Sequence, residues 1–200
     1  MPHSVPGETI NRLCASGLAS AVNASRMLAM GDANVAIAGG VENMTRGPWV
    51  ISKVSKAFGR DSQMHDSSFG WRFINPKLQE VYGTDGMGVT AENLVDMYNI
   101  SREDQDAFSY RSQMLATSAR DEGRLAEEIA PVSIPRRKQE DLIFEHDEFI
   151  KPGTTTEILA KLRPAFRKEG GSVTAGNASG LNDGSAALLL ANEQGLKDQK

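Results

Sequence analysis

The chain carries its only cysteine in the stretch NRLCASGL, residues 11–18. Residues 5–11 combine turn residues with β-branched ones and predict a short strand, and residues 15–30 predict a helix. Cys14 would then lie where backbone N–H groups have no partner within the helix and where the helix dipole is positive. Because both effects favour the thiolate over the thiol, the sequence predicts a nucleophilic sulfur at Cys14.

A buried structural role is the alternative for Cys14, because a lone cysteine is often a small buried hydrophobe. The helix that follows it favours the reactive interpretation, since Ala, Ser and Gly fill most of residues 15–25. Such a thin helix lets other backbone approach closely. This close approach could serve packing alone, or it could leave a narrow channel that leads a substrate to the sulfur.

Composition narrows the class of protein. With 200 residues, 40% of them hydrophobic, the chain can bury a substantial core in one or two domains. The formal charge of −4 argues against a nucleic-acid partner, and no apolar run is long enough to span a membrane. One cysteine forms no intramolecular disulfide and fits a reducing compartment, so we expect a cytoplasmic protein.

The pattern of apolar residues predicts an α/β fold with an interrupted sheet. Residues 5–11, 15–30 and 34–38 indicate a βαβ unit, whose second strand is apolar throughout, as in buried parallel sheets. Gly39 and Gly40 are expected to end that strand at the edge where α/β folds place ligands. The apolar run at residues 185–191 predicts a further buried strand of the same sheet. We therefore expect residues 1–43 to begin the sheet domain, residues 44–174 to be inserted, and residues 175–200 to return to it.

The insertion begins with an irregular stretch and continues with helices. Residues 45–84 mix basic and aromatic side chains, which could hold a nucleotide or could be a loop pinned by aromatic contacts. A helix is predicted over residues 90–98, closed by Asn99. A second begins at the N-cap Ser101 and runs to about residue 122. Residues 129–134 favour an edge strand at best, and residues 156–162 a short helix.

Several motifs resemble those of the thiolase family. NRLCASGL resembles the acyl-enzyme cysteine motif, and AGNASGLNDGSAA at 175–187 is similar to the segment that ends the family's inserted loop domain. Pieces at 38–44, 90–93, 101–108 and 160–166 also look alike, in order along the chain. FGWRFINP at 69–76 resembles the loop of thiolases acting on 3-oxoadipyl-CoA. The resemblance implies an α/β thiolase fold, of which this chain carries part of the N-terminal half, a mixed sheet with helices, and the loop domain.

The resemblance also implies a reaction. In thiolases the cysteine thiolate attacks the 3-oxo carbon of an acyl-CoA, acetyl-CoA is released as the C–C bond breaks, and a second CoA collects the acyl group. Cys14 would carry the acyl group, and its backbone N–H would contribute to an oxyanion hole. The resemblance implies coenzyme A and acyl-CoA as substrates, with no covalently bound cofactor and no metal.

Coenzyme A contacts follow from the same resemblance. Lys151 and Phe166 would lie beside the nucleotide, with Met87 nearby. The residues implied along the pantetheine arm are Ala175, Ala178, Ser179 and Leu181. Lys151 stands where relatives often carry Arg, so it retains attraction to phosphate but lacks a planar group for stacking. Ser179 could alternatively be a turn hydroxyl that caps local backbone.

The family's proton-transfer residues have no counterpart in this sequence. Thiolases use a Gly-His-Pro histidine, a second cysteine and an Asn-Glu-Ala-Phe asparagine, and their cysteine strand follows two earlier strands. We therefore expect a thiolase fragment truncated at both ends and inactive alone, whose parent is a homodimer or homotetramer. A non-catalytic CoA-binding or assembly module is the alternative.

Overall fold

The computed structural model describes residues 2–198, which form two compact units. Unit 1 joins the chain up to Pro48 to the segment that begins at Leu181, and unit 2 is Trp49–Gly180. The domain limits expected from the sequence fall a few residues before these two boundaries. In the described residues no helix combines the length and apolar character needed to cross a membrane.

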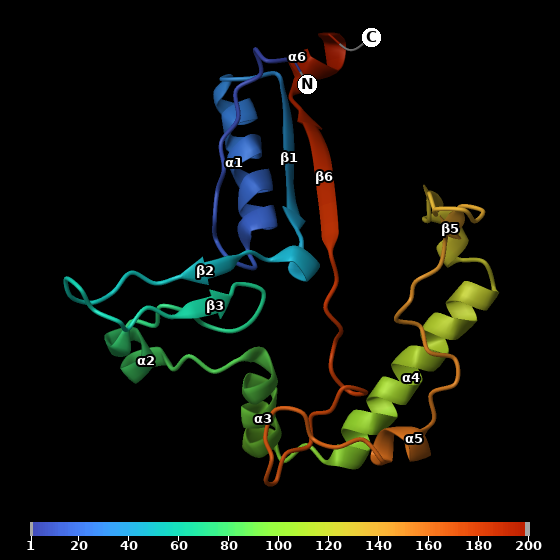
Figure 1. Ribbon diagram of the computed structural model, residues 1–200. Coiled ribbons are helices and arrows are strands. Elements are labelled where there is room, and N and C mark those ends of the chain that lie inside the picture. The colour runs from blue at the N-terminus through green and yellow to red at the C-terminus, as the bar shows by residue number, and fades with distance from the viewer. Residues whose placement is uncertain (1, 199–200) are drawn as a thin grey trace. The chain divides into compact units, whose positions relative to one another are not determined.

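Unit 1 is a two-stranded sheet with one long helix packed on it and a short helix at the end of the chain (Figure 1). The helices are α1 (Ser16–Met30) and α6 (Glu193–Asp198), the strands β1 (Val35–Glu42) and β6 (Gly184–Ala191), and a 3-10 turn covers Met44–Arg46. β1 and β6 run antiparallel in a register that pairs Val35 with Ala191 and Glu42 with Gly184. The two ends of the sequence thus build one sheet, as expected.

Small side chains form the core of unit 1. Ala24 and Leu28 of α1 are buried against Ala36 and Ala38 of β1, which lets the helix lie close to the sheet. Alternate residues of β1 point to the opposite face of the sheet. The large apolar side chains of β1 and β6 that stay more than half exposed are Ile37, Val41 and Leu189 on that face, and Leu188 on the face of Ala38.

Four expectations for this sheet are wrong. Residues 5–11 form no strand, and the parallel βαβ unit is absent, because β6 is the only partner of β1 within residues 2–198 and it runs antiparallel. β1 continues through Gly39, where a Cβ would lie 2.5 Å from the carbonyl oxygen of Ala186. β6 forms as predicted but is largely exposed instead of buried. A strand forms only beside a hydrogen-bonded neighbour, and it is buried only where another element covers its face. The sequence of the strand itself specifies neither of these partners.

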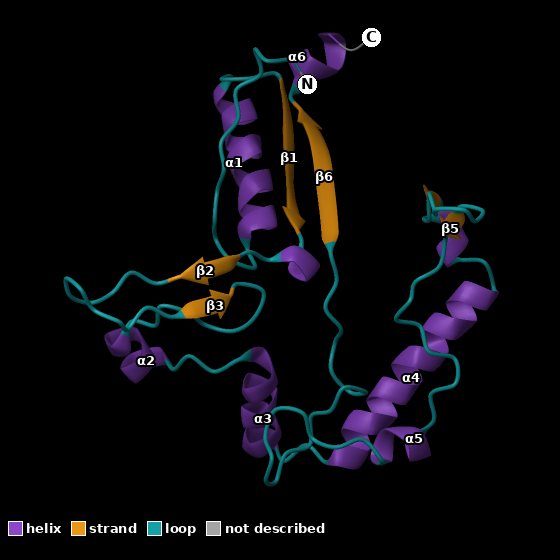
Figure 2. Ribbon diagram, in the orientation of Figure 1, coloured by secondary structure: helices purple, strands orange, loops and turns teal. Residues whose placement is uncertain are grey.

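Unit 2 is made of helices and two small hairpins (Figure 2). Its helices are α2 (Pro76–Tyr82), α3 (Met87–Tyr98), α4 (Arg102–Asp121) and α5 (Thr156–Ala160), with a 3-10 turn at Leu125–Glu127. Its hairpins pair β2 (Trp49–Ile51) with β3 (Met64–Asp66), and β4 (Val132–Ile134) with β5 (Leu142–Phe144).

Local signals define the helices of unit 2. Asn99 ends α3 in the left-handed conformation, with φ 51°, and the Ser101 side chain accepts a hydrogen bond from the N–H of Asp104 at 3.0 Å. Both predicted caps are confirmed. In the irregular stretch, the rings of His65 and Phe73 meet edge to face at 5.3 Å, which is the aromatic pinning that the sequence allowed.

Candidate functional site

Cys14 lies on a tight turn immediately before α1 and is exposed, so the buried alternative is wrong. Leu13 adopts φ 51°, a left-handed conformation that is uncommon for a residue other than glycine. Its N–H donates to Oδ1 of Asn11 at 2.9 Å, and its carbonyl accepts from the Ser16 hydroxyl at 2.7 Å. The N–H of Arg12 donates to Oγ of Ser16 at 2.8 Å. Side chains on both sides of Cys14 therefore fix the turn that carries it.

The start of α1 favours negative charge. The first turn of α1 contains no acidic residue, whose negative charge would offset the positive potential at the start of the helix. Within the described part of the chain, the N–H of Cys14 donates to no acceptor. A Cβ added at Gly17 would have no neighbour within 4 Å, so the thin side of the helix is unpacked at this point.

In unit 2, two of the residues expected near coenzyme A lie together. Met87 is the first residue of α3 and is 83% exposed. The ring of Phe166 lies directly on the backbone of Gly88, where a Cβ would collide with it. Met87 and Phe166 therefore belong to one local surface. Gly88, next to Met87, allows the ring of Phe166 to lie on the backbone because glycine has no Cβ.

Lys151 is held by α4. Its N–H donates to Oε1 of Gln113 at 2.7 Å, and its ammonium donates to the carbonyl of Glu148 at 2.6 Å. The ring of Phe149 lies on Gly180, where a Cβ would collide with it. The segment that carries Lys151 thus contacts the end of the glycine-rich loop that contains Ser179. Sequence reasoning missed both glycine–aromatic contacts, because each joins residues far apart in the chain.

The glycine-rich loop turns around Thr174, which is fully buried. Its hydroxyl oxygen accepts from the N–H groups of Gly176 and Asn177, at 3.1 and 3.3 Å. Ala175 and Ser179 are exposed and Ala178 is half-buried, while Leu181 begins the returning segment of unit 1. Among residues 2–198 the Ser179 hydroxyl has no hydrogen-bond partner, so it does not cap local backbone.

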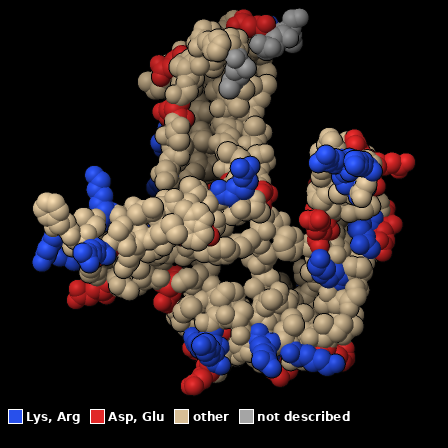
Figure 3. Space-filling view, in the orientation of Figure 1, with Lys and Arg blue, Asp and Glu red and all other residues tan. Residues whose placement is uncertain are grey.

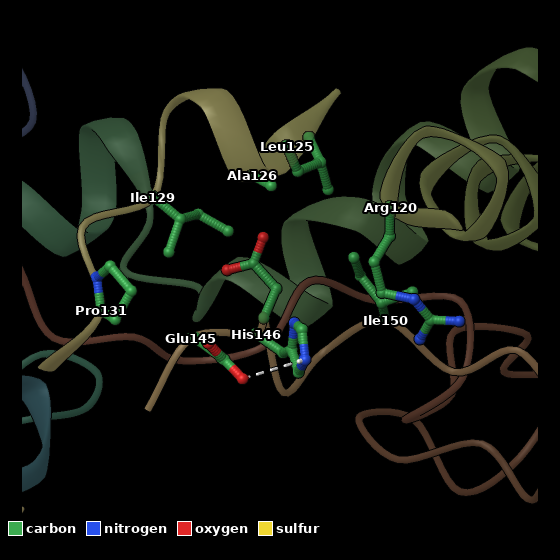
Figure 4. A pocket seen from close by; sticks show the side chains of 9 residues that line it. Arg120, Leu125, Ala126, Ile129, Pro131, Glu145, His146 and Ile150 are labelled. Atoms are coloured by element: carbon green, nitrogen blue, oxygen red, sulfur yellow. Dashed lines mark ion pairs between the residues drawn. The ribbon is translucent and has the colours of Figure 1, made fainter. Parts of the chain in front are cut away.

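Two hollows of unit 2 lie outside these residues. The one in Figure 4 has a volume of about 120 Å³, below the roughly 300–1,000 Å³ typical of ligand pockets. Its polar rim includes His146, whose Nε2 lies 3.9 Å from Oε1 of Glu145. The other, of about 430 Å³, is lined by the basic and aromatic stretch, including Lys53, Trp71 and Arg72. Neither hollow is lined by a residue expected to contact coenzyme A.

Charges of both signs are interspersed on the face of the molecule that Figure 3 shows. Most of that face carries neither charge, and Lys and Arg appear in small groups with Asp and Glu near several of them. An anion that binds this face would therefore be attracted by individual cations instead of by a broad basic surface.

Known proteins match nearly the whole chain. The family model for the N-terminal domain of thiolase matches residues 1–194. Beta-ketoadipyl-CoA thiolase of Pseudomonas aeruginosa is 52% identical over 197 residues, which are 98% of this chain and 49% of that protein. The 3-oxoadipyl-CoA/3-oxo-5,6-dehydrosuberyl-CoA thiolase of Escherichia coli is 50% identical over 194 residues, 97% of this chain and 48% of that protein.

Solved structures agree with the sequence matches. The acetyl-CoA acetyltransferase of Bacillus anthracis is 39% identical with a TM-score of 0.76, over 99% of this chain and 48% of that one. Human mitochondrial 3-ketoacyl-CoA thiolase is 37% identical with a TM-score of 0.79, over 99% of this chain and 49% of that one. The chain spans about half the length of the curated relatives it matches. The α/β thiolase fold expected from the sequence is confirmed, and the chain belongs to the thiolase family.

Proposed function

We propose that the complete protein transfers acyl groups between 3-oxoacyl-CoA and coenzyme A through an acyl-cysteine at Cys14. The observation that carries this proposal is the exposed thiol, held by a hydrogen-bonded turn at the start of α1. This placement suits a group that must ionise, meet a substrate and leave again.

The acyl transfer proposed for Cys14 has two steps. Its thiolate forms a bond to the 3-oxo carbon, and the C2–C3 bond then breaks. The electron pair goes to the acetyl-CoA enolate, which takes up a proton. The thiolate of a second coenzyme A attacks the thioester, and Cys14 leaves as a thiolate. The N–H of Cys14, which donates to no described residue, is available to stabilise the oxyanion in both steps.

The substrate class we propose is 3-oxoadipyl-CoA or a similar dicarboxylic acyl-CoA. Relatives named for beta-ketoadipyl-CoA are about half identical to this chain over the aligned residues, for example 52% over 197 residues in Pseudomonas aeruginosa. The FGWRFINP stretch supports the same class. Degradation of aromatic compounds or of fatty acids would supply such substrates.

We assign the coenzyme A contacts to unit 2, apart from Leu181, which begins the returning segment of unit 1. Lys151 and Phe166 would hold the nucleotide end, with Met87 beside Phe166. The pantetheine arm would run along Ala175, Ala178, Ser179 and Leu181. The exposed, unbonded hydroxyl of Ser179 supports this assignment. A solved human mitochondrial 3-ketoacyl-CoA thiolase in complex with CoA, 36% identical to this chain, provides the template for testing it.

A homo-oligomer in the cytoplasm remains our proposal for the complete protein. A reducing compartment keeps a thiol such as Cys14 available for chemistry. The exposed apolar face of β1 and β6 supports contact with further protein.

The test is acyl transfer measured by intact mass. The chain is incubated with acetyl-CoA, and a single acetyl adduct is expected on the wild type and absent from Cys14→Ala. In the complete protein, Cys14→Ala is expected to abolish thiolysis of 3-oxoadipyl-CoA. Tight binding of coenzyme A with a Cys14 that neither acetylates nor reacts with iodoacetamide would instead indicate the non-catalytic binding module.

A further inference from the structure

Two buried carboxylates lie under the glycine-rich loop of unit 2. Glu92 of α3 is 0% exposed and Asp106 of α4 is 4% exposed. A buried carboxylate is costly unless hydrogen bonds compensate its lost hydration. Both groups accept hydrogen bonds from the loop that carries Ser179.

Glu92 holds the start of the loop. Its Oε1 accepts from the backbone N–H groups of Ser172 and Val173, at 3.0 and 2.9 Å. Its Oε2 accepts from the Ser172 hydroxyl at 3.2 Å. One side chain of α3 therefore fixes two consecutive peptide groups, 80 residues further along the chain.

Asp106 holds the turn that follows. Its Oδ1 accepts from Nδ2 of Asn177 at 3.0 Å, and its Oδ2 accepts from Nε of Arg102 at 2.8 Å. Nη2 of Arg102 donates to the carbonyls of Leu159 and Leu162, at 2.7 and 3.0 Å. The pair thus has hydrogen-bond partners on both sides, and it connects the loop to α4 and to the end of α5.

Asn177 is the residue on which these contacts converge. Its Oδ1 accepts from the N–H of Thr174 at 2.7 Å, and its Nδ2 also donates to the carbonyl of Ser172 at 3.1 Å. The amide of Asn177 is therefore occupied inside unit 2. Two residues later, Ser179 is exposed and without a described partner.

We propose that Glu92, Asp106 and Asn177 are positioning residues that fix the loop in the shape needed to present Ser179 and Ala178 to pantetheine. This inference rests on the proposed binding of coenzyme A by the same loop. A loop that is already ordered loses less conformational entropy when a ligand binds, so the network raises affinity without touching the ligand. The competing explanation is that these hydrogen bonds only stabilise the fold of unit 2 and have no effect on ligand binding.

A charge swap separates the two explanations. Asn177→Asp places two carboxylates against each other and removes the donor to Asp106. Adding Asp106→Asn restores a donor and an acceptor at this contact, leaves an amide oxygen at position 106 to accept from Arg102, and keeps one carboxylate in the pair, now at position 177. The control is Asn75→Asp, the same chemical change at the N-cap of α2, where a carboxylate also accepts from Lys77 N–H.

Calorimetry with this 200-residue chain measures binding of coenzyme A, pantetheine and adenosine 3′,5′-bisphosphate. We expect Asn177→Asp to weaken coenzyme A and pantetheine about tenfold, as when a buried polar group loses its partner, and to leave the bisphosphate within about twofold. The double variant is expected to recover most of the loss, and Asn75→Asp to bind like the wild type. Ser179→Ala should cost less affinity in the Asn177→Asp chain than in the wild type, because Asn177 acts through Ser179.

Several results would overturn the inference. Unchanged pantetheine binding by Asn177→Asp would do so, and so would an equal loss for all three ligands without recovery in the double variant. If Asn177→Asp does not fold, Thr174→Val removes the acceptor for Gly176 and Asn177 at nearly constant volume, with the same expected pattern. A wild-type chain that binds no coenzyme A would refute the proposed function itself. If the wild type binds coenzyme A and Asn177→Asp binds pantetheine equally well, only the positioning role of the network is refuted.

Discussion

Thr45 and Asp183 lie 138 residues apart in the sequence, and the Thr45 hydroxyl donates a 2.6 Å hydrogen bond to Oδ2 of Asp183. The backbone N–H of Thr45 donates to Oδ1 of the same carboxylate at 2.9 Å. Both residues belong to unit 1 and lie just beyond the pair of Glu42 and Gly184, where β1 ends and β6 begins. The carboxylate therefore closes the sheet where the chain leaves unit 1 and returns to it.

These hydrogen bonds predict a pH dependence. The Thr45 side chain first, and then its N–H, lower the pKa of Asp183 below its ordinary value. Since the folded pKa is the lower one, the contact stabilises the fold above the unfolded pKa near 4, and this stability is lost as the pH falls through the folded pKa. We expect Thr45→Val to raise the Asp183 pKa in a carbon-detected NMR titration. An unchanged titration curve would contradict the role of Thr45.

The left-handed backbone conformation of Leu13 predicts which substitutions are tolerated in the turn that carries Cys14. Leu13→Val should destabilise the fold by about 1–3 kcal/mol, because a β-branched side chain is strained at φ 51°. Leu13→Gly should be tolerated, since glycine adopts this conformation freely. Urea unfolding measures the stability, and iodoacetamide labelling of Cys14, the only cysteine, reports on the turn. Equal stability of the valine and glycine variants would show that the turn is not fixed at Leu13.

The contact of Gly88 with Phe166 predicts a steric effect. Gly88→Ala should cost about 1–3 kcal/mol, because the added Cβ collides with the ring of Phe166. Gly153→Ala is the matched control in unit 2, since no atom lies within 4 Å of its Cβ. Phe166→Leu should reduce the penalty of Gly88→Ala in a double-mutant cycle. Additive effects in that cycle would contradict the contact.

Four of the helices, α1, α3, α4 and α5, were predicted from the sequence because their signals are local, whereas α2 and α6 were missed. Ser101 and Asn99 cap α4 and α3 through groups within four residues, and the glycine after Met30 ends α1. The strand at residues 5–11 and the burial of β6 were not predictable, because both depend on neighbours that a local pattern does not specify. The network under the glycine-rich loop was missed for the same reason. Nothing near Glu92 in sequence indicates that a glutamate will be buried against a segment 80 residues away.

The last prediction concerns what the 200 residues can do by themselves. We expect Cys14 to take an acetyl group from acetyl-CoA, because that exchange of thioesters needs only the thiolate and stabilisation of the oxyanion. Cleavage of 3-oxoadipyl-CoA also needs an acid to protonate the departing enolate, and a positioned acid contributes about 10²–10⁴-fold in rate. The sequence contains neither a Gly-His-Pro segment nor a second cysteine. We therefore expect an acetyl adduct on Cys14 and no steady-state thiolysis by this chain. Turnover that Cys14→Ser abolishes would mean that residues of this chain supply the missing acid.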